Sequence, residues 1–139
     1  MSKQAKTSIR LVAAIVLLLV LASCASEPSL SPGTYTATIT REDSTSYFTI
    51  GEWELTLTEG NGYSLTKDGR IDEEGDYTLT QDQIEFAATF AATSAESNCF
   101  VTGTYQWAFD GKELTLTTVE DECEGRPTIF TTHPWSRQD

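Results

Sequence analysis

The stretch CFVTGTYQWAFDGKELTLTTVEDEC, residues 99–123, decides the fold class of this 139-residue chain. Aromatic residues alternate with small or polar ones over residues 105–109, a two-residue period that is typical of a half-buried β-strand. Asp110-Gly111 follows, a dipeptide that suits the positive φ of tight hairpin turns, and a second alternating run begins at residue 113. The stretch therefore predicts a β-hairpin with one aromatic face.

Similar short alternating segments fill the chain from residue 33 onward, with turn-forming residues between them. The expected strands cover residues 33–40, 47–58, 63–66, 71–80, 84 onward, 104–109, 113–117 and 127–132. About eight sequential strands, each with one apolar face and short connections, predict an all-β domain folded as an antiparallel up-and-down barrel. A β-sandwich is the alternative, and the barrel is preferred because closure removes exposed strand edges.

Residues 87–98, AATFAATSAESN, break this pattern. They fit an extension of the preceding strand or a short helix equally well. We expect a loop that lies against one end of the barrel, and a mobile lid over a cavity is the functional alternative.

The first 24 residues indicate export. Three basic residues precede an apolar run over residues 11–21, which is shorter than the roughly 20 residues of a membrane-spanning helix. The run ends in Leu21-Ala22-Ser23-Cys24, which resembles the lipobox of bacterial lipoproteins. That resemblance implies a signal peptide over residues 1–23 and acylation of Cys24; an ordinary secretory signal is the alternative.

The resemblance also implies a location in the cell envelope, on the extracytoplasmic side. The anchor would be the outer membrane in a cell with two membranes, and otherwise the outer face of the cell membrane. Residues 24–32 contain two Pro and several Ser, which predicts a short lipidated tether. Residues 33–139 then form one domain with a modest core.

Charge excludes some classes of partner. The chain has nine Lys and Arg and 21 Asp and Glu. Cleavage of the expected signal peptide would remove three basic residues and no acidic ones, which leaves a net charge of about −15. Such a chain repels nucleic acids and anionic lipid surfaces, so we expect membrane contact through the lipid alone. The acidic runs 72–74 and 120–122, with Glu124, are expected to be solvated turn charges rather than Ca²⁺ ligands.

Two cysteines remain once Cys24 is assigned to lipid. In an oxidising compartment, Cys99 and Cys123 are expected to form a disulfide across the open end of the predicted hairpin. Free thiols or a metal pair are the alternatives, which a single His and the absence of Cys-x-x-Cys spacing disfavour.

Motifs of catalysis and cofactor binding are missing from the sequence. There is no Gly-x-Ser-x-Gly, no His-Glu-x-x-His and no phosphate-binding Gly loop, and the single His, His133, lies beside Pro134 and Trp135, where we expect it to pack or to face solvent. We therefore expect a protein without enzymatic activity, cofactor or metal.

Function is expected to depend on the side chains that the alternation points inward. An eight-stranded barrel either fills its interior with side chains or leaves room for one small ligand. The residues expected to line a ligand site are Trp53, Leu55, Tyr63, Tyr77, Phe86, Tyr105 and Trp107. The same aromatics would serve equally well as a solid core.

The domain resembles the lipocalin-like or calycin families, specifically small bacterial lipocalin-like lipoproteins. Gly33-Thr34-Tyr35, Gly51-Glu52-Trp53, the eight-strand meander and a late Arg, either Arg126 or Arg137, carry this resemblance. It implies non-catalytic binding of a small hydrophobic or amphipathic molecule in the barrel. The alternative is a solid-core structural or protein-interaction module whose acidic loops meet a basic partner, for instance as an inhibitor of a cationic extracellular enzyme.

Overall fold

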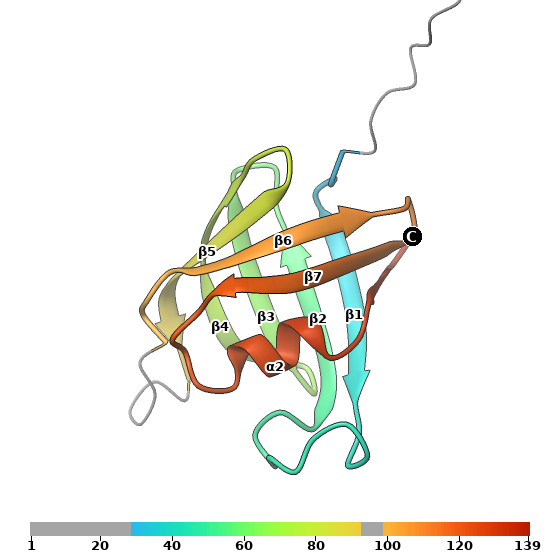
Figure 1. The fold of residues 1–139 in the computed structure, drawn as a ribbon, viewed down its shortest axis with the longest axis vertical. Coiled ribbons are helices and arrows are strands. Elements are labelled where there is room, and N and C mark those ends of the chain that lie inside the picture. The colour runs from blue at the N-terminus through green and yellow to red at the C-terminus, as the bar shows by residue number, and fades with distance from the viewer. Residues whose placement is uncertain (1–28, 93–98) are drawn as a thin grey trace, which may run out of the picture.

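The computed structural model describes residues 29–92 and 99–139 (Figure 1). The expected signal peptide, Cys24 and residues 25–28 of the tether lie outside the described residues, as do residues 93–98 of the expected loop. Within the described ranges, no helix has the length and apolar character needed to span a membrane.

Eight strands close into one barrel in sequential order, with every neighbouring pair antiparallel. Their bounds are β1 Gly33–Ile39, β2 Gly51–Leu57, β3 Gly62–Lys67, β4 Arg70–Leu79, β5 Gln83–Ala91, β6 Gly103–Phe109, β7 Glu113–Glu120 and β8 Trp135–Arg137. The expected all-β, eight-stranded up-and-down barrel is thus confirmed, and the sandwich is excluded.

Alternation of side chains builds the core. In β2, Trp53 and Leu55 are buried while Glu52 and Glu54 are exposed. The register places Leu55 between Tyr35 of β1 and Leu65 of β3, so apolar side chains of neighbouring strands meet on the inner face. The interior is therefore continuous from strand to strand.

The last expected strand, residues 127–132, is wrong. These residues belong to the helix α2, Arg126–Thr131, which packs against β7, and the closing strand β8 comes after it (Figure 1). Pro127 lies in the first turn of α2, where backbone N–H groups have no acceptor within the helix, so the N–H that proline lacks costs no hydrogen bond. Ile129 and Phe130 then point into the barrel as buried side chains.

The expected loop 87–98 is also corrected in its first part. Residues 87–91 continue β5 and pair with β4, with a register shift between Glu74 and Gly75. Gly75 is needed there, because a Cβ would lie 2.0 Å from the carbonyl oxygen of Ala87.

The two ends of the barrel have different contents. The end where β1 begins carries the β2–β3, β4–β5 and β6–β7 turns and the C-terminus, and we call it the proximal end because the chain enters there from the expected tether (Figure 1). The opposite, distal end carries the loop 40–50, the β3–β4 turn and the segment 121–125 that leads into α2.

A disulfide joins Cys99 to Cys123 at the distal end, as the sequence predicts. It links the segment before β6 to the segment after β7, and both cysteines are buried. The bond therefore clamps the open end of the β6–β7 hairpin beside the start of α2.

Reduction of this disulfide should lower the melting temperature by several degrees. The loop that it closes has a sequence separation of 24 residues, for which chain entropy alone predicts roughly 3 to 4 kcal/mol of stabilisation. Thermal melts with and without reductant measure the effect, and the C99S/C123S variant should melt low in both. Two titratable thiols in the untreated protein, together with a melting point that reductant leaves unchanged, would contradict the prediction.

Candidate functional site

The residues predicted to line a ligand site lie where the alternation places them. The buried members are Trp53, Leu55, Tyr63, Tyr77, Phe86 and Tyr105. Trp107 is half-buried at the edge of the same core, and its Nε1 donates to the Thr80 carbonyl at 3.1 Å. The structure thus brings the whole set together around one interior.

The helix α2 packs against β7 and directs the Phe130 side chain into that interior. The Phe130 ring lies 4.8 Å from the Phe86 ring, 5.1 Å from that of Tyr105 and 6.0 Å from that of Trp135, measured between centroids. Trp135 Nε1 donates to the Phe130 carbonyl at 3.1 Å, which ties the closing strand to the helix. The predicted ligand-lining aromatics therefore contact one another and Phe130.

A buried ion cluster lies at the start of α2. The Arg126 guanidinium donates through Nε to Asp121 Oδ2 at 2.6 Å and through Nη1 to Glu73 Oε1 at 3.2 Å. The Tyr63 hydroxyl donates to Glu73 at 2.5 Å, and the Tyr105 hydroxyl donates to Asp121. The expectation that both acidic runs are solvated turn charges is wrong for Glu73 and Asp121, which are the two buried partners of Arg126.

Backbone geometry around the disulfide completes this cluster. Arg126 also donates to the carbonyls of Cys99 and Val101, at 3.4 and 2.7 Å. Gly103 leaves room for the ion pair, because a Cβ there would lie 2.3 Å from an Asp121 oxygen. Every buried side-chain nitrogen and oxygen in the described ranges has a hydrogen-bond partner, so no buried polar atom of the cluster is left unsatisfied.

Burial shifts the protonation of the cluster. It raises the pKa of Glu73, while the Arg126 guanidinium and the Tyr63 hydroxyl act in the opposite direction. It also raises the pKa of Tyr63 and Tyr105, so both phenols stay protonated and act as donors. Burial alone would lower the pKa of Arg126, but hydrogen bonds to Asp121 and the charges of both carboxylates raise it.

The sequence pattern gave no sign of this cluster, because Glu73 and Arg126 are 53 residues apart. Of the two late arginines, Arg137 is the one that covers an aromatic at a barrel end: its guanidinium carbon lies 6.0 Å from the Phe109 ring centroid, at the proximal end. Arg126 lies inside the distal end instead.

The donor set of the distal end does not suit a metal ion. Glu73, Cys99 and Cys123 bring potential ligand atoms within 4.8 Å of one another. The two sulfurs are joined in the disulfide, however, and metal binding uses thiolate. Oε1 of Glu73 already accepts from Tyr63 and Arg126.

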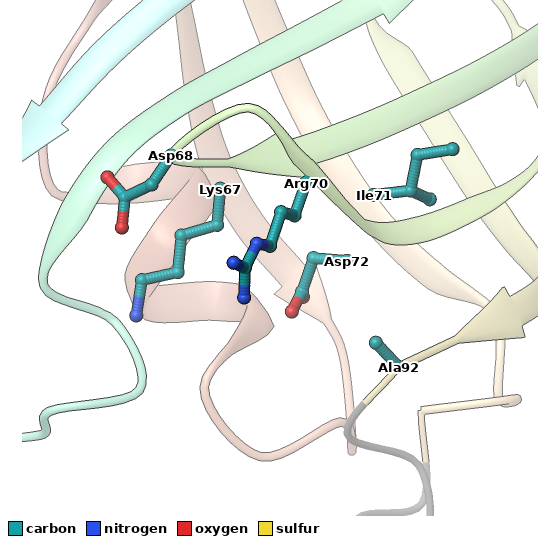
Figure 2. Close-up of a pocket in the computed structure, with 6 residues that line it drawn as sticks. All are labelled: Lys67, Asp68, Arg70, Ile71, Asp72 and Ala92. Carbon is teal, nitrogen blue, oxygen red and sulfur yellow. The ribbon is translucent and has the colours of Figure 1, made fainter.

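A shallow hollow of about 460 Å³ opens at the distal end beside this cluster. It is lined by Lys67, Asp68, Arg70, Ile71, Asp72 and Ala92. Figure 2 shows the side chains of Lys67, Arg70 and Asp72 directed into the same space, while Ile71 points away. Burial raises the pKa of Asp72, against the opposing charge of Lys67.

Two more hollows, of about 420 and 530 Å³, lie over the outer face of β1 to β3 and beside the β6–β7 turn. All three hollows are open to solvent, and none of them is enclosed within the barrel. His133 is outside these hollows, and its Nε2 lies 3.0 Å from Asp43 Oδ2.

Comparison of the chain with protein-family models, with curated proteins and with solved structures found no match.

Replacement of Arg126 by Met should destabilise the protein by about 3–5 kcal/mol at pH 7, because Glu73 and Asp121 would stay buried without a cation. A carboxyl with a raised pKa favours the folded state when protonated. The loss of unfolding free energy caused by R126M should therefore become smaller as the pH falls toward 4.5, the ordinary pKa of Glu.

Urea unfolding at several pH values measures both effects. Arg41 is an exposed arginine at the same end of the barrel, so R41M serves as the control and should change stability by less than about 0.5 kcal/mol. An R126M protein as stable as the parent at pH 7, or one whose deficit is the same at every pH, would show that the cluster does not act through its charges.

Truncation of Phe130 to Ala should lower stability by about 3–5 kcal/mol and leave a dry apolar cavity. Its ring is fully buried among the aromatics of the interior. Benzene should then bind to F130A and not to the parent protein, as ligand-induced shifts of methyl resonances would report. Equal binding to both proteins would mean that the parent interior already has room for a ligand.

Proposed function

We propose that this protein is a lipoprotein, anchored through Cys24 on the extracytoplasmic side of a membrane, whose solid barrel serves as a protein-interaction module. The observation that carries the proposal is the packing of Phe130 against Phe86 and Tyr105, which occupies the space that an interior ligand would need. Function then falls to the outer surface.

The charge of that surface indicates the partner. With a net charge of about −15 after processing, the chain favours a basic protein and repels polyanions. Glu120, Glu122 and Glu124 are exposed around the disulfide at the distal end, while the intervening Asp121 and Cys123 are buried or half-buried. The buried pairing of Asp121 with Arg126 fixes the backbone that presents these three carboxylates.

Binding of a small apolar molecule in the barrel is the rival function. It would use Trp53, Tyr105 and the other inward aromatics, and it requires the Phe130 side chain of α2 to leave the interior. Displacement of α2 would separate the Arg126 ion pairs from their buried partners, which opposes ligand entry.

The proposal predicts saturable, salt-sensitive binding to a basic protein of the same compartment. The full-length acylated protein, immobilised through a C-terminal tag, is to be tested against cationic proteins of the host's extracytoplasmic fraction at low and high salt. Binding should weaken about tenfold in the E120Q/E122Q/E124Q variant. The variant E52Q/E54Q/E59Q removes three other exposed charges and should have a smaller effect.

Native mass spectrometry of the same preparation separates the two functions. We expect the mass of the acylated chain with no additional small molecule. An apolar compound that co-purifies with the parent protein, or the absence of any saturable basic partner, would overturn the proposal in favour of the interior site.

A further inference from the structure

Two aromatic side chains are exposed at the distal end, in the loop 40–50. Tyr47 is 78% exposed and Phe48 is 69% exposed, although most aromatics of the barrel are buried. Their rings pack edge to face, with centroids 6.5 Å apart. We call these two residues the distal aromatic pair.

The structure holds the backbone of this pair in place. Lys67 Nζ donates to the carbonyls of both Tyr47 and Phe48, each at 3.1 Å. On the C-terminal side of the pair, Trp53 Nε1 donates to the Thr49 carbonyl at 2.7 Å. The aromatic pair is therefore preorganised, which reduces the entropy lost when a ligand binds to it.

The other side of the loop is fixed as well. Asp43 accepts hydrogen bonds from the backbone N–H and the hydroxyl of Thr40, at 2.8 and 2.7 Å, and pairs with His133. The hydrogen bond with His133, followed by those with Thr40, lowers the pKa of Asp43 to about 2. The Asp43 carboxylate therefore stays charged at neutral pH and keeps accepting from Thr40.

The hollow of Figure 2 adjoins the pair, because Lys67 lines the hollow and donates to the carbonyls of Tyr47 and Phe48. Two of its polar side chains have no hydrogen-bond or ion-pair partner within the described residues: the guanidinium of Arg70 and the carboxylate of Asp72. One is a donor and the other is an acceptor, and they point into the same space. A ligand in the hollow would therefore need both kinds of hydrogen-bonding group.

Charge around the hollow is balanced in an otherwise acidic protein. Two cations, Lys67 and Arg70, and two anions, Asp68 and Asp72, line the hollow close together along the chain. A ligand with a strong charge of either sign would meet a like charge at close range. The surroundings favour a neutral ligand.

We propose that the distal aromatic pair and the adjoining hollow bind a neutral oligosaccharide. The apolar face of a sugar ring would pack on Tyr47 and Phe48, and sugar hydroxyls, which donate and accept, would pair with Asp72 and Arg70. A volume of about 460 Å³ falls within the range of small-molecule sites. This site goes beyond the proposed protein partner and uses residues other than the acidic segment 120–124.

Isothermal titration of the full-length acylated protein with cellohexaose, maltohexaose and N-acetylchitohexaose tests the proposal. The detergent must have a polyoxyethylene head group, because sugar head groups would compete. At least one oligosaccharide should bind saturably, and Y47A/F48A should weaken it at least about tenfold. R70M and D72N should each weaken it several-fold.

Matched surface variants serve as controls. Leu79 is an exposed apolar residue, 38% exposed, and Lys112 is an exposed cation, and both lie at the proximal end. L79A and K112M should bind the oligosaccharide as the parent does, and so should E120Q/E122Q/E124Q. The last variant separates this site from the proposed protein interface.

Three results would overturn the inference. The first is that none of the three oligosaccharides binds to the parent protein. The second is binding that survives in Y47A/F48A. The third is that the sugars do not bind but a zwitterion such as glycine betaine, or a cationic protein, does, and that this binding disappears in Y47A/F48A, R70M and D72N. If an oligosaccharide binds but no basic protein binds saturably, only the proposed function is contradicted.

Discussion

The placement of α2 depends on the Arg126 guanidinium, which pairs with Glu73 of β4 and with Asp121 just before the helix. A helix of six residues is too short to be stable alone. A buried ion pair adds little net stability, but any arrangement that separates its members leaves charges without partners. The cluster therefore selects the one arrangement in which Phe130 lies inside the barrel. The disulfide strengthens this selection by fixing the two segments whose carbonyls and carboxylate receive the guanidinium.

Aromatic packing inside the barrel leaves the two ends of the molecule with different features. The core fixes the strands, the proximal end receives the chain from its expected anchor, and the distal end carries the two most exposed aromatic side chains of the described ranges. These are Tyr47 and Phe48, and the three glutamates beside the disulfide are exposed at the same end. The loop 40–50 and the segment 121–125 are both fixed by buried contacts, through Trp53 and Arg126 respectively. Rigid presentation of this kind is typical of binding surfaces that rely on preorganisation.

Most of the barrel could be predicted from the sequence because strand signals are local. The two-residue period placed Trp53, Tyr63 and Tyr105 on the inner face, and hairpin turns such as Asp110-Gly111 set the order of the strands. The helix was missed because residues 127–132 are mostly β-branched or aromatic, which is typical of strands, although Gly125 and Pro127 were signals of a helix start. The ion cluster could not be predicted, since Glu73 and Asp121 become partners of Arg126 only after the barrel brings distant strands together.

The same cluster explains why inward aromatics alone do not reveal the function of a small barrel. Eight strands enclose a space that a few side chains can fill. Here one buried ring, Phe130, contacts the rings of Phe86, Tyr105 and Trp135, so the difference between a solid and a hollow barrel lies in a single short helix. Residues that hold this helix, rather than residues that line the interior, then decide which function the barrel can perform. In this chain those residues are charged and lie in acidic runs or near a helix start, where a sequence pattern alone assigns them to solvent.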